Sequence, residues 1–274
     1  MSIRLTDLGT EMTGRLATVT SNAARVLHDV VDDTSAFIDE AVRLTGWADD
    51  GSMAFDARDV LVERLREPSG RLHVISLPSK AGDIGRTRDW VLNTDSTMAR
   101  QFHMSWPTTL IENRQMVRAV EDSPHSALWW DPDSDDLPVF VAAHGNSTGF
   151  ALKVQERPNA PLPRRLPKLH DVFTDGVQFG RLLVAMREEI DRVAASPHSP
   201  IVLLGCQTGQ RHAEAGRWAS TEIHQAGIQR DVYASSGIVY VRPSGHIVIA
   251  PSSDRSGDIE PIWTKYPWQA ATIP

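Results

Sequence analysis

The chain is organised around two short apolar stretches, each of which begins with proline and ends in a reactive residue beside a glycine. They are Pro138-Val139-Phe140-Val141-Ala142-Ala143-His144-Gly145 and Pro200-Ile201-Val202-Leu203-Leu204-Gly205-Cys206. Runs of this length, apolar on both faces and rich in branched residues, are typical of strands in the middle of a sheet. If the two strands are parallel, His144 and Cys206 lie at the same edge, and the carboxyl edge of an open α/β sheet is where ligands bind.

Further strands and helices are predicted to alternate around these two stretches. The pattern indicates strands at 72–77, 150–154 and 232–234, helices at 175–195 and 212–227, and a hairpin from 238–241 and 246–250. Strands that alternate with helices favour right-handed crossovers and a mostly parallel sheet. We therefore predict an α/β fold, a mostly parallel sheet flanked by helices, for residues 69–274.

Residues 1–68 are predicted to form a helical N-terminal segment. Apolar residues follow one another at steps of three and four from Leu5 to about Val31, which is the spacing of one helix face. Either a second helix passes through Phe37 and Leu44 or the first helix continues unbroken to that point, and another helix is predicted from Asp56 to Arg66. These helices either pack on the main domain or, because the apolar stripe is narrow, form an arm that docks on a protein partner or oligomerises.

Composition excludes several classes of protein. The 274 residues suffice for one large domain with a helical extension, and the formal charge of −7 argues against a nucleic-acid partner. A single cysteine rules out an intramolecular disulfide. No run approaches the roughly 20 apolar residues that span a membrane, and residues 1–20 contain no apolar signal region. We expect a soluble protein without a membrane partner, cytoplasmic or exported without a cleavable signal peptide.

The lone cysteine is the sharpest functional signal. A buried cysteine often packs simply as a small apolar side chain, but Cys206 ends an apolar strand where residues 207–210 turn toward the next predicted helix. A thiol at a helix N-terminus has a lowered pKa and is more nucleophilic. His144 ends the companion strand and can protonate a leaving amine, while the N–H groups of Gly145 and Cys206 can hold an oxyanion.

Other chemistries lack their motifs. None of the ten histidines has the His-Glu-x-x-His spacing of a zinc site, and no phosphate-binding glycine loop follows a strand. In the stretch from Gly205 to Gly209 the nucleophile stands one place too early for a lipase-type elbow. We therefore predict no metal and no cofactor.

The order and spacing of the motifs resemble the caspase-like (clan CD) cysteine peptidases, in particular the self-processing cysteine protease domains and similar domains of bacterial polymorphic toxins. The matching stretches are Ala143-His144-Gly145-Asn146, Gly205-Cys206-Gln207-Thr208-Gly209 and Val232-Tyr233-Ala234. The resemblance covers roughly residues 137–250, and residues 1–68 match nothing in the family. Some toxin members are switched on by inositol phosphate, but the basic, proline-rich stretch 157–168 is interpreted as a solvated loop.

The resemblance implies a function and a set of site residues. His144 and Cys206 become the catalytic dyad, Gly145 and Cys206 the oxyanion site, and a polypeptide substrate lies extended by strand addition. The residues implied for substrate binding are Val232, Tyr233, Ala234, Ser235 and Ser236. The prediction is a cysteine endopeptidase, self-processing or toxin-associated. The alternatives are a catalytically silent interaction or assembly module, and acyl transfer or amide hydrolysis on a small molecule.

Overall fold

In a computed structural model the chain divides into two compact units, Met1–Trp47 and Ala48–Pro274. The structure describes parts of the second unit only: residues 55–80, 82–107, 119–121, 124–130, 136–155, 169–251 and 262–268. The helices predicted within residues 1–54, and the loop at 157–168, lie outside these ranges. Within the described ranges, no helix has the length and apolar character needed to cross a membrane.

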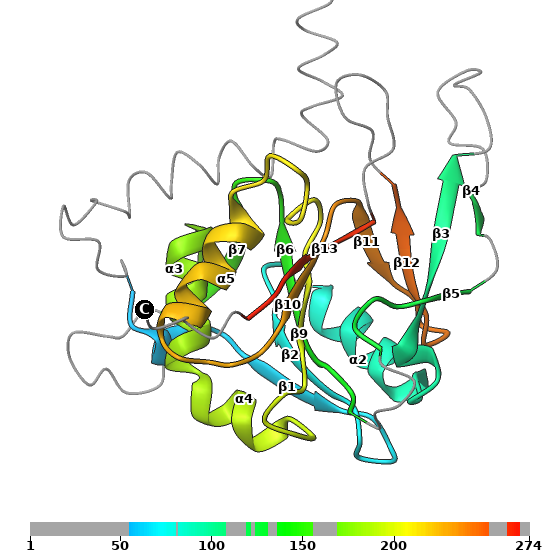
Figure 1. Ribbon diagram of the computed structural model, residues 1–274, viewed down its shortest axis with the longest axis horizontal. Helices are drawn as coiled ribbons and strands as arrows, with labels where there is room; N and C mark the ends of the chain where they lie inside the picture. Colours follow the sequence, from blue (N-terminus) through cyan, green and yellow to red (C-terminus); the bar gives the residue numbers. More distant parts are fainter. Residues whose placement is uncertain are drawn as a thin grey trace, which may run out of the picture. The chain divides into compact units, whose positions relative to one another are not determined.

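A mixed sheet of eight strands forms the centre of the described unit, in the order β1-β2-β6-β9-β10-β13, with β7 and β8 continuing from β6 (Figure 1). Strands β2, β6, β9 and β10 are parallel, whereas β1 and β13 pair antiparallel at the two edges. The strands are β1 (Glu63–Arg66), β2 (His73–Leu77), β6 (Val139–Gly145), β7 (Gly149–Gln155), β8 (Leu169–Asp175), β9 (Ile201–Leu204), β10 (Val232–Ser235) and β13 (Trp263–Tyr266).

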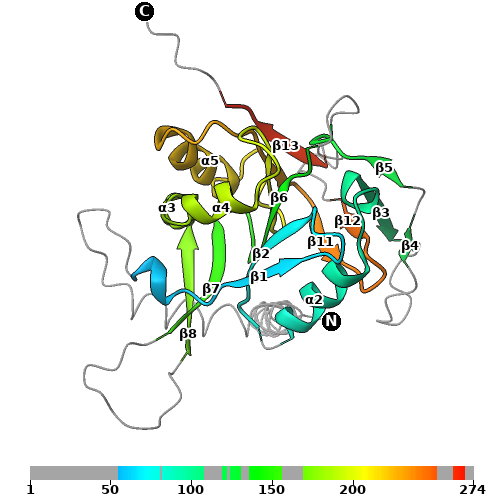
Figure 2. The same cartoon turned by 90° about the horizontal axis from the view of Figure 1, so that it is seen from below.

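Both faces of this sheet are covered, which explains the unbroken apolar runs of its central strands. Val139 and Val141 pack with α3 (Gly176–Ala185) and α5 (Ala215–Gln225), whereas Phe140 between them packs against Trp90 of α2 (Asp83–Asn93) on the other face. A further helix, α4 (Arg187–Val193), follows α3. Figures 1 and 2 show α3 and α5 together on one side of the sheet and α2 on the other. The predicted α/β fold, with a sheet flanked by helices, is confirmed, but the sheet is mixed: its four central strands are parallel and the strands added around them pair antiparallel.

A second sheet lies beside α2 (Figure 2). Its order is β11-β12-β3-β4, with β5 also paired to β3. The strands are β3 (Gln101–Pro107), β4 (Ala119–Glu121), β5 (His125–Ser126), β11 (Ile238–Val241) and β12 (Ile247–Ala250). The predicted hairpin is therefore confirmed as β11 and β12, which pair antiparallel. Within the described residues β11 pairs with β12 only, so it is an edge strand of this sheet.

The helix predicted from Asp56 to Arg66 is wrong. Asp56 caps a short 3-10 turn, η1 (Ala57–Asp59), and Glu63–Arg66 is strand β1, which pairs antiparallel with β2. The reason is the tight connection between these strands, in which the Glu67 carboxylate accepts hydrogen bonds from the N–H groups of Ser69, Arg71 and Leu72. The main sheet consequently begins at residue 63, before the domain boundary predicted at 68/69.

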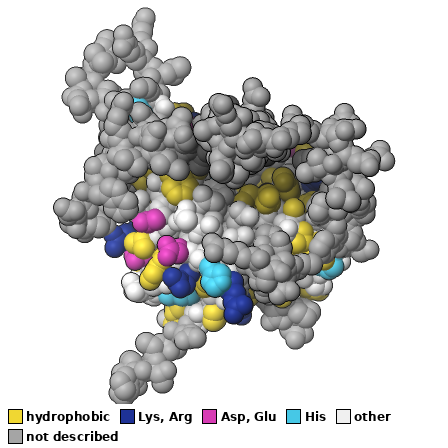
Figure 3. Space-filling model, turned by 90° about the horizontal axis from the view of Figure 1, so that it is seen from above, with side chains coloured by type: hydrophobic (Ala, Val, Ile, Leu, Met, Phe, Trp, Pro, Cys, Tyr) yellow, Lys and Arg dark blue, Asp and Glu magenta, His cyan; other side chains and the backbone are white. Residues whose placement is uncertain are grey.

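Exposed apolar side chains lie among charged and histidine side chains on the face shown in Figure 3. The large apolar residues exposed among those described are Leu92, Leu128, Leu169, Trp218, Ile238 and Tyr240. Ile238 and Tyr240 both belong to the edge strand β11, whose pattern alternates between exposed and half-buried residues.

Candidate active site

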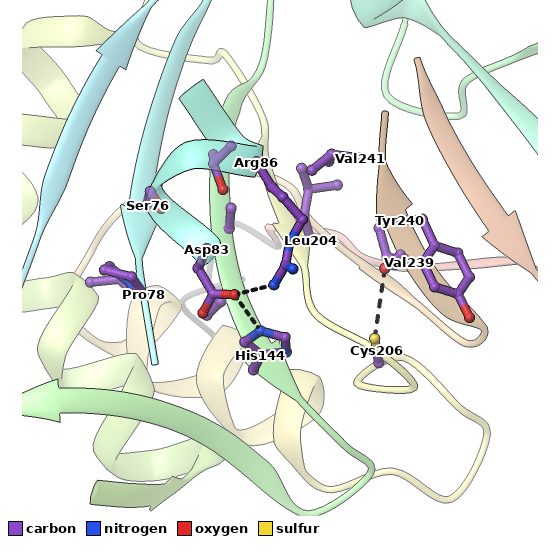
Figure 4. A pocket seen from close by; sticks show the side chains of 14 residues that line it. Ser76, Pro78, Asp83, Arg86, His144, Leu204, Cys206, Val239, Tyr240 and Val241 are labelled. Carbon is purple, nitrogen blue, oxygen red and sulfur yellow. Dashed lines mark hydrogen bonds and ion pairs between the residues drawn. The ribbon is translucent and has the colours of Figure 1, made fainter. Parts of the chain in front are cut away.

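The two predicted catalytic residues line one pocket. In the parallel pair of β6 and β9, Ala142 lies opposite Leu204, so the residues that follow emerge at the same edge of the sheet. His144 and Cys206 both line a cavity of about 300 Å³ at this edge. Figure 4 shows His144 directed toward Asp83 on one side of the pocket and Cys206 directed toward Val239 on the other. The apolar walls include Leu77, Pro78, Ala142, Leu204, Val239 and Val241.

Asp83 is a pocket residue in contact with His144 that the sequence analysis did not single out. It is the first residue of α2, which follows β2, and its Oδ1 lies 2.9 Å from His144 Nε2. Its other oxygen, Oδ2, accepts hydrogen bonds from the N–H groups of Ser79 at 3.0 Å and Lys80 at 2.7 Å. The sequence did contain one signal for this residue. The predicted strand at 72–77 ends at the same sheet edge as the histidine strand, and the carboxylate of Asp83 follows it within a few residues.

The surroundings keep Asp83 ionised. Burial alone would raise the pKa of Asp83, but the hydrogen bond and charge of His144, with the N–H groups of Lys80 and Ser79, hold it well below its usual range. An ionised carboxylate only accepts hydrogen bonds, so Nε2 of His144 carries the hydrogen in this contact. Nδ1 is then the nitrogen that can take a proton, and the carboxylate fixes both tautomer and ring orientation.

Arg86 contacts the same carboxylate oxygen as the histidine. Its Nη2 lies 2.7 Å from Asp83 Oδ1, one turn along α2, and its side chain remains 59% exposed. Among the described residues that line the pocket, Arg86 is the only lysine or arginine. Asp83 therefore carries contacts from two cationic or potentially cationic side chains and two backbone donors.

The thiol of Cys206 points to strand β11 rather than to the histidine. Its Sγ lies 3.8 Å from the carbonyl oxygen of Val239. Burial raises the pKa of the Cys206 thiol, although its hydrogen bonds act in the opposite direction. The lowered pKa expected from a helix N-terminus is therefore wrong, because the next helix, α5, begins only at Ala215. The resting form of this residue is the neutral thiol.

A tight turn after Cys206 holds the sulfur in place. Gln207 has a positive φ of 58°, a conformation that costs energy for residues other than glycine. Its N–H donates to the carbonyl of Gly237 at 2.8 Å, and the N–H of Gly209 donates to that of Ser235 at 2.7 Å. The turn that carries the cysteine is thus hydrogen-bonded to the chain that leads directly into β11.

Gly145, the predicted oxyanion donor, ends strand β6 directly after His144 and is not among the described residues that line the pocket. The N–H of Asn146 donates to Gly149 at 3.0 Å in the turn between β6 and β7. Donor directions alternate along an antiparallel pair, so the neighbouring Gly145, opposite Phe150, directs its N–H away from β7. A Cβ at Gly145 would lie 2.7 Å from Thr208 Cγ2, a contact that only glycine avoids.

The position predicted for the substrate is wrong in this structure. Residues Val232 to Ser236 are all buried, with Tyr233 the most exposed at 4%. The strand β10, formed by Val232, Tyr233, Ala234 and Ser235, pairs with β9 on one side and β13 on the other, and Ser236 N–H donates to the carbonyl of Ile262. Both edges are occupied, so a peptide has no free edge to join here.

Strand β11 offers the edge that β10 lacks. Val239, Tyr240 and Val241 line the pocket together with both predicted catalytic residues. Because the carbonyl of Val239 is directed at Cys206, it faces away from β12, and in an antiparallel pair the N–H of the same residue faces the same way. The main-chain groups of Val239 therefore face the pocket.

No protein-family model matches the chain, and no curated protein matches it.

Among the described residues, no three His, Cys, Asp or Glu side chains gather in a way that could hold a metal ion.

Proposed function

We propose that the protein is a cysteine endopeptidase of the caspase-like type, with Cys206 as nucleophile, His144 as proton carrier and Asp83 as the group that orients the histidine. One observation carries the proposal: a thiol and an imidazole, from the ends of adjacent parallel strands, line one pocket, and the imidazole is bound to a buried carboxylate. The resemblance of the His-Gly, Cys-x-Thr-Gly and Val-Tyr-Ala stretches to clan CD peptidases supports it.

The reaction proceeds in two balanced steps. The Cys206 sulfur forms a bond to the scissile carbonyl carbon while the thiol proton passes to Nδ1 of His144. The carbon–nitrogen bond then breaks as His144 returns this proton to the departing amine, which leaves a thioester on Cys206. A water molecule gives a proton to His144 and adds its hydroxyl to the thioester carbon; the carbon–sulfur bond then breaks, the proton returns from His144 to sulfur, and the product leaves as the carboxylic acid. The Asp83 carboxylate stabilises the imidazolium between these transfers.

The oxyanion is assigned to the backbone N–H groups of Gly145 and Cys206. The Gly145 amide directs its N–H away from β7, so pairing with that strand does not occupy it. Backbone donors that are fixed before the reaction stabilise negative charge without reorganisation, which makes this contribution a large one.

The peptide docks along the free edge of β11 in this proposal. Main-chain hydrogen bonds to an exposed strand edge are a common mode of peptide recognition. The β11 edge is preferred to β10 because its Val239 groups face the pocket, whereas both edges of β10 are paired. Docking there brings the scissile carbonyl between the thiol on one side and the histidine on the other.

A catalytically silent caspase-like module is the second candidate. The observation in its favour is the resting thiol, which donates to Val239 and has a raised pKa instead of pairing with the histidine. In such a module the protein acts by binding a partner, and the pocket has no chemical role.

Digestion of a peptide library distinguishes the two candidates. The full chain and the variants Cys206→Ala and His144→Ala are incubated with proteome-derived peptides, and the cleaved bonds are identified by mass spectrometry. The peptidase predicts cleavage by the wild type that both variants lose. A library left intact by the wild type favours the silent module, and cleavage that persists in Cys206→Ala rejects the assigned nucleophile.

A further inference from the structure

Strand β11, which forms one wall of the pocket, is held by its pairing with β12, by the packing of Val239 and Val241 on the core, and by hydrogen bonds at its two ends. Along its length it pairs with β12, and β12 in turn pairs with β3 through only two residue pairs, Val248 with His103 and Ile249 with Met104. Before β11, the carbonyl of Gly237 accepts the N–H of Gln207 from the cysteine turn. After β11, the turn that leads to β12 is attached to helix α2.

The attachment to α2 consists of two buried hydrogen bonds to one carbonyl. Gly245, in the turn between β11 and β12, accepts from Trp90 Nε1 at 3.0 Å and from Thr94 Oγ1 at 2.9 Å. Trp90 is fully buried and Thr94 is 5% exposed. Gly245 has a φ of +91°, and a Cβ there would lie 2.3 Å from the carbonyl oxygen of Asn93. The hairpin turn is therefore seated closely on the end of the helix.

The same helix holds the catalytic carboxylate at its other end. Asp83 is the first residue of α2 and contacts His144, while Trp90 lies two turns further on and packs edge-to-face on Phe140 of β6 at 5.6 Å. A helix of this length is a stiff element of about 16 Å. It links the histidine side of the pocket to the hairpin that forms the opposite wall.

We infer that Trp90 and Thr94 are positioning residues, which set the place of β11 relative to His144 and Cys206 by holding the carbonyl of Gly245. This inference rests on the proposed function, because it assigns the two residues a role in binding the peptide that docks on β11. They touch neither the substrate nor the reacting atoms. Loss of their hydrogen bonds loosens one wall of the pocket and leaves the Asp83–His144 contact in place.

The test compares two pairs of matched substitutions. Trp90→Phe with Thr94→Val removes both donors to Gly245; valine keeps the shape of threonine, and phenylalanine keeps a smaller aromatic ring against Phe140. Trp129→Phe is the control for the tryptophan, because Trp129 Nε1 also donates to a buried carbonyl, that of Ala99 at 3.0 Å, and also packs on Phe140. Thr174→Val is the control for the threonine, since buried Thr174 donates to the carbonyl of Phe150.

The kinetic readout is KM against kcat for a peptide that the wild type cleaves. The double variant Trp90→Phe/Thr94→Val is expected to raise KM about tenfold and to change kcat by no more than about twofold. Trp129→Phe and Thr174→Val, despite a similar loss of thermal stability, are expected to keep KM within about twofold of wild type. Equal KM values in the double variant and the controls would overturn the inference and leave the peptidase proposal standing.

Hydrogen exchange keeps the inference testable without catalysis. Tyr240 directs its amide to β12, because its neighbour Val239 faces away. Exchange at Tyr240 is expected to be faster in the double variant than in Trp129→Phe, measured on the full chain. Equal exchange rates would reject the positioning role. If the wild type cleaves no peptide but the amide of Tyr240 exchanges faster in the double variant than in Trp129→Phe, only the proposed function is rejected.

Discussion

Asp83 Oδ1 and His144 Nε2 lie 2.9 Å apart, although the two residues are separated by 61 positions and come from the start of α2 and the end of β6. The carboxylate is 9% exposed and the imidazole 42% exposed, so the pair presents its histidine to the pocket and keeps its carboxylate behind it. This arrangement gives the histidine a defined tautomer before any substrate arrives.

Replacement of the carboxylate tests this pair. Asp83→Asn keeps the side-chain shape but removes the charge that fixes the Nε2–H tautomer. We expect kcat for a cleaved peptide to fall by up to about 10⁴-fold, as when the aspartate that orients a catalytic histidine is replaced by asparagine. Asp175→Asn is the matched control, because Asp175 caps the N-terminus of α3 by accepting from Gln178 N–H, and asparagine also caps helices. Unchanged activity in Asp83→Asn would show that the histidine needs no orienting partner.

Asp83 also makes the free energy of unfolding of the protein depend on pH. The pKa of Asp83 is lower in the folded protein than in the unfolded chain, so its stabilising contribution is complete above the unfolded value of about 3.9 and is lost as the pH falls through the folded value. Urea unfolding at about pH 6 and about pH 3 should show a difference between wild type and Asp83→Asn that shrinks at the lower pH. A difference that stays constant would mean that Asp83 titrates normally.

The resting thiol should be slow to alkylate. Because burial raises the pKa of Cys206, and because it is the only cysteine of the chain, its reaction with iodoacetamide should be slow at about pH 7 and should accelerate above the usual thiol pKa of about 8.5. The rate is measured by intact mass against pH. A rate that already reaches its maximum near neutral pH would contradict the assigned neutral thiol.

Two glycines with different surroundings should respond oppositely to a methyl group. Gly145→Ala places a Cβ 2.7 Å from Thr208 Cγ2 under the cysteine turn and should destabilise the protein by about 1–3 kcal/mol. Gly85, inside α2, has no atom within 4 Å of an added Cβ, and Gly85→Ala should stabilise by about 0.5–1 kcal/mol. Urea unfolding measures the free energy of unfolding of both variants. If Gly145→Ala raises it as much as Gly85→Ala does, the cysteine turn readily rearranges to accept the methyl group.

The docking edge is tested with proline. Val239→Pro removes an N–H that faces the pocket, and edge strands tolerate proline, so KM for a cleaved peptide should rise about tenfold with little loss of stability. Tyr240→Pro removes an N–H that faces β12 and should instead lower the free energy of unfolding. A KM that is unaffected in Val239→Pro would place the peptide elsewhere.

The strands that carry the dyad were predictable because their signal is local. A strand buried on both faces is a continuous apolar run, and β6 and β9 are such runs with His144 and Cys206 just beyond them. The β11–β12 hairpin was predictable for the same reason, since its strands flank a proline–glycine turn.

Other features depend on contacts between distant parts of the chain. Asp83 contacts His144 only because α2 begins beside the sheet edge, and β13 covers β10 through pairs such as Ser235 with Trp263. Strand β1 was predicted as a helix because its apolar spacing fits both structures, and its pairing with β2 decided between them. The pKa of Cys206 was predicted in the wrong direction because the burial that raises it comes from distant parts of the chain packed around the thiol, not from the local sequence.

The central claim is that Cys206 forms a covalent bond to the substrate with the help of His144. It is tested most directly by mass spectrometry of the intact protein, quenched with acid during turnover of a cleaved peptide and then digested to find the modified residue. The account predicts an acyl group, with the mass of the amino-terminal product, attached to Cys206 in wild type and absent from His144→Ala. Turnover without an adduct on Cys206, or with an adduct on another residue, would contradict it.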